Sequence, residues 1–150
     1  MRLYRLAKTA YVRDLQGTGC LYFGGRWHRQ GTRILYTSES ASLAILEVLA
    51  NTRRLPVNYA ILVLEVPDPG EIDEVDLADI PPDWNHLPYP DALADLTEAW
   101  VASERTYLRR VPSVHSPLEH NVLLNPQHPD HARTRIVSVL PYRFDARLKA

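Results

Sequence analysis

The run Asn58–Val66, NYAILVLEV, constrains the fold most, because apolar side chains occupy both alternating sets of its positions. Such a strand is buried on both faces, so the run predicts a central strand of a covered sheet. Pro67 ends it, and residues 67–90 are rich in proline and acidic residues, which predicts an irregular surface stretch. The chain of 150 residues has the length of one domain and can bury a core without disulfides.

Two helices and several short strands are expected around this strand. Ser40 is a predicted N-cap for a helix that runs to about Asn51, and a second helix is predicted over Asp91–Glu104. Glycines interrupt residues 14–32, which predicts a loop. Scattered strands with two helices favour an α+β fold over a regular βαβ series. The further strands are predicted at Arg2–Ala7, Arg33–Thr37, Tyr107–Val111, Asn121–Leu124 and Arg135–Leu140.

The formal net charge of −1 conceals three segments of opposite sign. Residues 1–55 hold nine Lys or Arg against three acidic residues, residues 56–104 hold none against twelve, and residues 105–150 hold eight against three. The acidic middle is a solvated surface, scaffold or a face for a partner protein, and an anionic ligand would bind where the two basic thirds meet. Near-neutrality overall argues against direct binding of nucleic acid.

The cysteine content and the hydropathy of the chain indicate the cellular compartment in which the protein is expected. Cys20 is the only cysteine, which excludes an intrachain disulfide or a cysteine-based zinc cluster and fits a reducing compartment. The first fifteen residues lack the apolar core of a signal peptide. No run approaches the roughly 18 apolar residues of a membrane span. These features predict a soluble cytoplasmic protein that does not bind membranes.

Glu47 is the first candidate for chemistry, because it is the single carboxylate in the apolar helical run SLAILEVLA. A carboxylate buried in such a helix is costly unless it is paired or functional. The alternative is a narrow polar stripe that faces water, formed with Ser40, Asn51 and Arg54. Helical spacing alone does not decide between these two interpretations.

Two further strings are compatible with a binding site. In Gly24-Gly25-Arg26-Trp27, paired glycines permit close approach of the backbone to a ligand, and the Arg26 fork suits phosphate. The spacing is not that of a phosphate-binding loop, so a tight turn beside an exposed arginine is the alternative. Tyr36 is either a core aromatic or a site residue.

The last third of the chain contains four histidines, which are His115, His120, His128 and His131. His128 and His131 have a spacing that allows one metal to be shared, as in a metal-dependent hydrolase. Pro129 lies between them, however, and no known metal-ligand signature is present. The sequence therefore predicts no metal site.

In order along the chain, several strings resemble the RES-domain family: LYRLA, GTG, GGRWHRQG, ILYTSES, SLAILEVL, VPSV, NVLLNP followed by HP, and FDARL. The resemblance spans about residues 2–148, so residues 1–150 are expected to be a single RES domain. It implies a fold similar to that of ADP-ribosyltransferase toxins, with central mixed or antiparallel strands and flanking helices. It further implies the toxin of a bacterial type II toxin–antitoxin pair, an enzyme that cleaves the nicotinamide–ribose bond of NAD. The acceptor of the ADP-ribose would be water, phosphate or a protein.

The same resemblance implies a site and partners. Glu47 would stabilise an oxocarbenium-like transition state, arginines would bind the pyrophosphate, and Tyr36 would stack on nicotinamide. Ser113 and Asn121 would offer hydrogen-bond donors and acceptors to the ribose or the phosphates. NAD would be a substrate, with no metal required. The implied partners are an Xre-type helix-turn-helix antitoxin and a second copy of the chain. A non-catalytic domain that binds a nucleotide or a partner protein is the alternative. The implied site residues are Arg5, Arg26, Tyr36, Glu47, Ser113 and Asn121, with Asn125 as the alternative to Asn121.

Overall fold

The strand predicted over Asn58–Val66 is β3 (Tyr59–Glu65) in the computed structural model, which describes residues 1–149. Its alternate side chains enter two different apolar clusters: Leu62 and Leu64 pack in one, and Ile61 packs in the other. The strand is therefore buried from both faces, as predicted. It is an interior strand of the sheet, although not the middle one.

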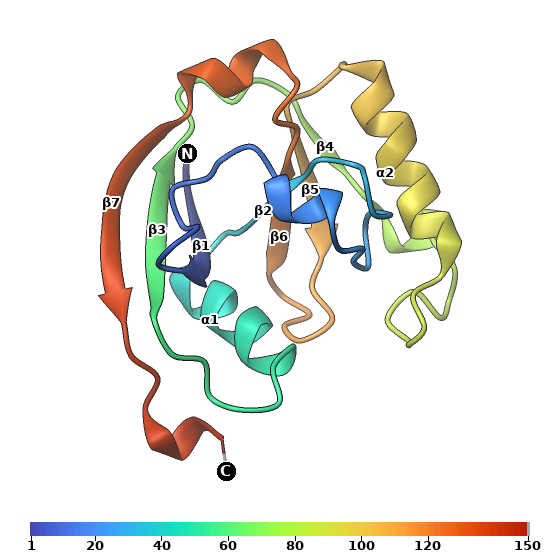
Figure 1. The fold of residues 1–150 in the computed structure, drawn as a ribbon. Helices are drawn as coiled ribbons and strands as arrows, with labels where there is room; N and C mark the ends of the chain where they lie inside the picture. The colour runs from blue at the N-terminus through green and yellow to red at the C-terminus, as the bar shows by residue number, and fades with distance from the viewer. Residues whose placement is uncertain (150) are drawn as a thin grey trace.

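Seven strands form one sheet, in the order β4-β5-β6-β2-β1-β3-β7 (Figure 1). Neighbouring strands are antiparallel except for β4 and β5, which are parallel. The mixed sheet confirms the predicted strand arrangement. Besides β3, the strands are β1 (Arg2–Lys8), β2 (Leu35–Ser38), β4 (Ile72–Glu74), β5 (Leu108–Pro112), β6 (His120–Leu124) and β7 (Arg135–Tyr142).

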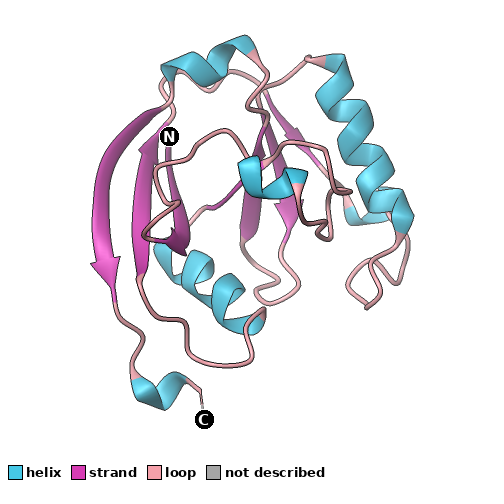
Figure 2. Ribbon diagram, in the orientation of Figure 1, coloured by secondary structure: helices cyan, strands magenta, loops and turns pink. Residues whose placement is uncertain are grey.

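Two α-helices flank the sheet at separate places (Figure 2). Helix α1 (Ala41–Ala50) packs on β1 and β2. Helix α2 (Asp91–Ser103) contributes Leu93 and Trp100 to an apolar cluster that also holds residues of β5 and β6. Within residues 1–149, no helix has the length and apolar character needed to cross a membrane. The short 3-10 helices are Thr18–Leu21, Leu77–Asp79, Pro129–Arg133 and Ala146–Leu148.

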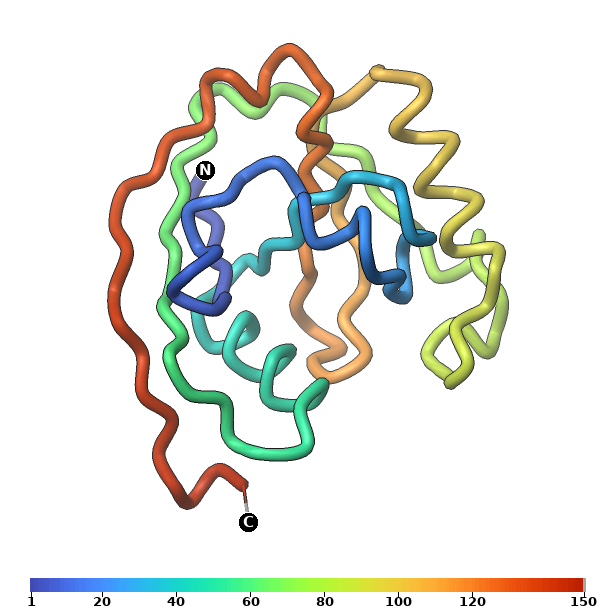
Figure 3. Tube along the Cα trace, in the orientation of Figure 1, coloured from blue at the N-terminus to red at the C-terminus, as the bar shows by residue number. Residues whose placement is uncertain are grey.

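The glycine-rich segment between β1 and β2 crosses in front of the sheet, as the blue part of the trace shows (Figure 3). Gly17 is required there for two reasons. It has a φ of 64°, and a Cβ atom at this position would lie 2.7 Å from the carbonyl oxygen of Ile34. The backbone therefore passes close to the start of β2, which brings residues 24–28 beside Tyr36.

The acidic stretch 67–90 is more ordered than its composition predicts. It contains β4, which pairs with the basic strand β5. The Asp73 carboxylate lies 2.6 Å from Arg105 and 2.9 Å from Arg109, and Glu74 lies 2.6 Å from Arg110. The interpretation of a purely solvated acidic face is wrong for these residues, because the last third of the chain pairs with them.

The capping of α1 gives a first prediction. Ser40 is the N-cap, as expected, and its Oγ accepts a hydrogen bond of 3.1 Å from the backbone N–H of Leu43. Replacing Ser40 by alanine is expected to lower the free energy of unfolding by about 1 kcal/mol. Urea denaturation followed by circular dichroism measures this change. Ser42→Ala, at an exposed position of the same turn, is the control, and equal stability of the two variants would show that the cap is unimportant.

Candidate active site

A cavity of about 660 Å³ is lined by residues of α1, β1, β2, the glycine-rich loop and the β5–β6 connection. The two basic thirds of the chain meet here, as expected for an anion site, because β2 pairs with β6. The walls include five of the six residues predicted for the site: Arg5, Arg26, Tyr36, Glu47 and Asn121.

Glu47 is held at the cavity wall by two hydrogen bonds to one of its oxygens. Its Oε1 accepts from Ser113 Oγ at 2.7 Å and from Asn121 Nδ2 at 2.8 Å. Ser38 Oγ in turn donates to Asn121 Oδ1 at 2.7 Å, which fixes the orientation of that amide. Within residues 1–149, no group donates a hydrogen bond to Oε2. Glu47 is thus neither a core residue nor part of a stripe in bulk water, since 24% of its side chain is exposed and it lines the cavity.

Ser113 hydrogen-bonds to Glu47 but is not part of the cavity wall. Its side chain is buried, and its Oγ accepts the backbone N–H groups of His115 and Ser116 while donating to Glu47. Its geometry therefore assigns it to positioning the carboxylate.

Of the two candidate asparagines, Asn121 lines the cavity. Asn125 is fully buried at a turn, where its Oδ1 accepts the backbone N–H of Gln127 and its Nδ2 donates to the Val101 carbonyl. These partners explain Asn125 as a structural residue.

The GGRW string forms a tight turn, and it also places Arg26 at the cavity wall, where a ligand could bind. Gly25 donates its backbone N–H to the carbonyl of His28 at 3.0 Å, which makes a tight turn. Trp27 is buried in the cluster beneath α2, and its ring lies 6.3 Å from that of Trp84. Because Trp27 anchors the turn, its neighbours Arg26 and His28 are fixed at the cavity wall.

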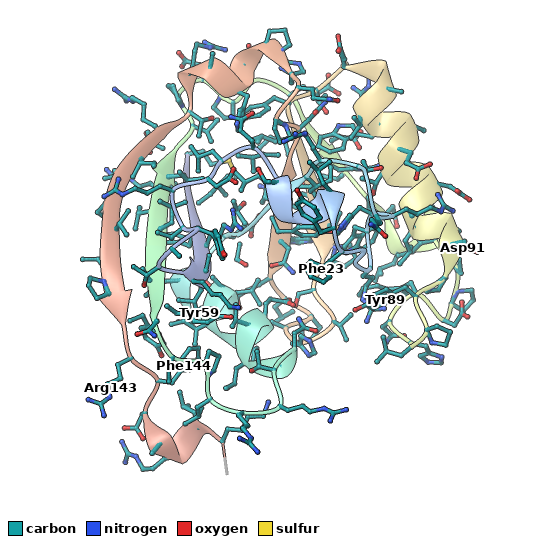
Figure 4. All side chains as sticks on the ribbon, in the orientation of Figure 1. Phe23, Tyr59, Tyr89, Asp91, Arg143 and Phe144 are labelled. Carbon is teal, nitrogen blue, oxygen red and sulfur yellow. The ribbon has the colours of Figure 1, made fainter. Side chains whose placement is uncertain are left out.

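Arg26 is held by the segment that precedes α2. Its Nη1 donates to the carbonyls of Trp84 at 2.7 Å and His86 at 2.9 Å, and its guanidinium lies 4.7 Å from the centre of the Tyr89 ring, which Figure 4 labels. Burial lowers the pKa of Arg26, yet arginine remains protonated. No acceptor among residues 1–149 engages Nε or Nη2, which leaves one edge of the fork for an anion.

Tyr89 is therefore a site residue that sequence reasoning missed. It belongs to the acidic middle, from which no site residue was expected. Residues 84–89 lack helical or strand periodicity, so nothing local indicated that this segment returns to the glycine-rich loop.

Arg5 supplies a second cation on β1. Its Nη1 donates to the carbonyl of Asp14 at 3.2 Å. Burial lowers the pKa of Arg5, and the nearby charge of Asp14 partly offsets this effect. The cavity wall therefore carries two arginines and one carboxylate, Glu47.

Tyr36 is oriented by a histidine that sequence reasoning also missed as a site residue. His28 Nε2 lies 2.8 Å from the carbonyl of Phe23, so this nitrogen carries the proton. Burial lowers the pKa of His28 and raises that of Tyr36 well above its usual value, so both are neutral near pH 7. Nδ1 of His28 therefore accepts the Tyr36 hydroxyl proton, at 2.5 Å. In the sequence, His28 is distinguished only by its place in the string GGRWH. The contact between His28 and Tyr36 depends on the fold.

The late histidines have different partners. His115 lines the cavity, whereas His120 Nδ1 lies 3.9 Å from Glu39 Oε2. His128 and His131 both pack on Tyr107, whose hydroxyl lies 2.7 Å from His131 Nδ1. The part of the chain described here, residues 1–149, brings no three His, Cys, Asp or Glu side chains into a metal-binding group.

The chain is similar to several known proteins. The model of the RES domain matches residues 2–145. The protein named Toxin Res of Photorhabdus laumondii is 37% identical over 99% of this chain and 97% of its own length. The Prs ADP-ribosylating toxin of a Sphingobium species is 34% identical over 95% of this chain and 91% of its own length.

The fold has a solved counterpart. A chain in the crystal structure of the M. tuberculosis MbcT–MbcA toxin–antitoxin complex matches with a TM-score of 0.74 over 94% of this chain and 83% of that chain, at 16% identity. This likeness confirms the predicted α+β fold. The RES domain match and the two toxins named above confirm the predicted resemblance to RES toxins. The chain therefore belongs to the RES domain family.

Proposed function

We propose that this RES-family toxin acts by cleaving the bond between nicotinamide and ribose in NAD. The observation that carries the proposal is Glu47, a carboxylate whose Oε1 is held by Ser113 and Asn121 in a cavity that also contains two arginines. A relative that is 34% identical is named an ADP-ribosylating toxin, and transfer of ADP-ribose from NAD requires the same cleavage.

The role proposed for Glu47 follows from the transition state. Departure of nicotinamide leaves positive charge on the ribose, as in glycoside cleavage. A fixed negative charge lowers the energy of such a state most when no reorganisation is needed. Ser113 and Asn121 supply that fixation through Oε1, so Oε2 remains for the ribose.

The other cavity residues suit the rest of NAD. The pyrophosphate carries two negative charges, and the free edge of Arg26 together with Arg5 offers charge-assisted hydrogen bonds. The Tyr36 ring, oriented by His28, is proposed to stack on nicotinamide and hold it in a reactive pose. NAD is a substrate in this proposal, and each step uses side chains of this chain without a metal ion.

The partners belong to the same proposal. A solved structure with this fold is a toxin–antitoxin complex, which supports an antitoxin partner for this chain. The finer inference is an Xre-type helix-turn-helix antitoxin that carries any DNA contact, with the toxin as a homodimer. Light scattering of the purified chain, alone and with an antitoxin encoded beside it, measures both states, and a monomer that does not bind would contradict them.

Incubation of the purified protein with NAD tests the activity. We expect release of nicotinamide, and mass spectrometry of the products in phosphate buffer, in phosphate-free buffer and with lysate protein identifies the acceptor. A folded protein that releases no nicotinamide under any of these conditions would contradict the proposal. Calorimetry that then detects intact NAD binding would instead support a non-catalytic nucleotide-binding domain.

A further inference from the structure

We propose that His115 removes the proton from the hydroxyl acceptor, water or a protein hydroxyl, that attacks the ribose of NAD. This inference rests on the proposed cleavage of NAD and assigns the residue that handles the second half of the reaction. His115 lies in the connection between β5 and β6, where it lines the cavity.

One hydroxyl fixes both Glu47 and His115. Ser113 Oγ donates to Glu47 Oε1 and accepts the backbone N–H of His115 at 3.1 Å. The imidazole Nε2 lies 4.0 Å from Glu47 Oε2, the carboxylate oxygen proposed to face the ribose. The histidine is thus placed beside the carbon where the new bond forms.

The two arginines, Tyr36 and His28 of the cavity cannot take this proton, and the Glu47 carboxylate is already assigned to the positive charge on the ribose. Arg5 and Arg26 are already protonated, and Tyr36 uses its hydroxyl proton to bind His28. Both ring nitrogens of His28 are engaged, one by the Phe23 carbonyl and one by Tyr36.

His115 differs from His28 in its accessibility. No side chain or backbone group of residues 1–149 hydrogen-bonds to the ring nitrogens of His115, and 35% of its side chain is exposed. An imidazole is the side chain whose ordinary pKa suits proton transfer near neutral pH. His115 is therefore the cavity histidine that has a free nitrogen for an incoming acceptor.

The step balances as follows. The bond between the anomeric carbon and the nicotinamide nitrogen breaks, and its electron pair neutralises the pyridinium. An acceptor oxygen forms a bond to the anomeric carbon, and its proton moves to His115 Nε2. The imidazolium that results lies beside the Glu47 carboxylate, which stabilises it. His115 then returns the proton to solvent through its exposed edge.

The experiment compares His115→Gln with His120→Gln, a matched change on β6 outside the cavity. Glutamine keeps polarity and approximate size but is not a base. We expect His115→Gln to lower hydrolysis of NAD about 100-fold, the low end of general-base effects, and His120→Gln to leave it unchanged. Sodium azide is the second probe, because this anion has no proton to lose. Azide is expected to restore nicotinamide release in His115→Gln, with ADP-ribosyl azide found by mass spectrometry.

The outcomes separate the two proposals. A wild-type protein that releases no nicotinamide overturns the proposed function and the role of His115 with it. A wild-type protein that is active while His115→Gln hydrolyses NAD equally well overturns only the assignment of His115. The same holds if His115→Gln loses activity equally with water and with azide, because a purely structural defect would affect both acceptors alike. Circular dichroism confirms that each variant is folded.

Discussion

Replacing Glu47 by glutamine is expected to lower nicotinamide release from NAD about 10³-fold while leaving the fold intact. A unit charge about 4 Å from the developing positive charge is worth about 4 kcal/mol at an effective dielectric constant of about 20. That energy corresponds to about three powers of ten in rate. Glutamine keeps an oxygen that accepts from Ser113 and Asn121, so the substitution removes the charge and little else.

The measurement must separate catalysis from binding. We expect the loss in kcat, because the positive charge develops only in the transition state, and a smaller effect on NAD affinity measured by calorimetry. Expression of the wild-type chain in bacteria is expected to arrest growth, whereas expression of Glu47→Gln is not. Glu104→Gln, an exposed carboxylate after α2, is the control. Turnover by Glu47→Gln within tenfold of wild type would remove Glu47 from the mechanism.

The elements that were predictable from the sequence are those whose signals are local. Helix α1 has an N-cap serine and an apolar run, and β3 has apolar residues on both of its faces. The short strand β4 gives no such signal, because three residues in an acidic, proline-rich stretch show no periodicity. It forms through pairing with β5 and through ion pairs to arginines such as Arg110, which are contacts between distant parts of the chain.

The candidate site also combines residues that have a local sequence signal with residues that only long-range contacts place there. Helical spacing left the environment of Glu47 undecided, because the residues that settle it, Ser113 and Asn121, are 66 and 74 positions away. They reach Glu47 because β6 pairs with β2, immediately before α1. Similarly, the hydrogen bond between His28 and Tyr36 and the approach of Tyr89 to Arg26 depend on loops that no periodic pattern describes. Resemblance to a family located the strings that contain Arg26, Tyr36 and Glu47, whereas the residues that contact them could be identified only from the fold.

Replacing Gly25 by alanine is expected to lower NAD turnover by roughly 10²-fold, although Gly25 has no side chain. A Cβ atom there would lie 2.9 Å from Cε1 and 3.1 Å from Nδ1 of His28, and 3.4 Å from the Tyr36 hydroxyl. His28 cannot easily move away, because its Nε2 is bound to the Phe23 carbonyl and the side chain is buried. The added methyl group therefore separates His28 from Tyr36, and misplacement of a positioning ring by about 1 Å costs on the order of 10²-fold in rate.

Gly19 provides a matched control in the same loop, outside the cavity. A Cβ atom at this exposed position would meet no atom within 4 Å. Gly19→Ala is therefore expected to retain NAD turnover and thermal stability, whereas Gly25→Ala loses turnover. Steady-state kinetics of nicotinamide release, with melting temperatures for both variants, measures the contrast. Equal turnover by the two variants would show that the contact between His28 and Tyr36 does not position the nicotinamide, since only Gly25→Ala disturbs that contact.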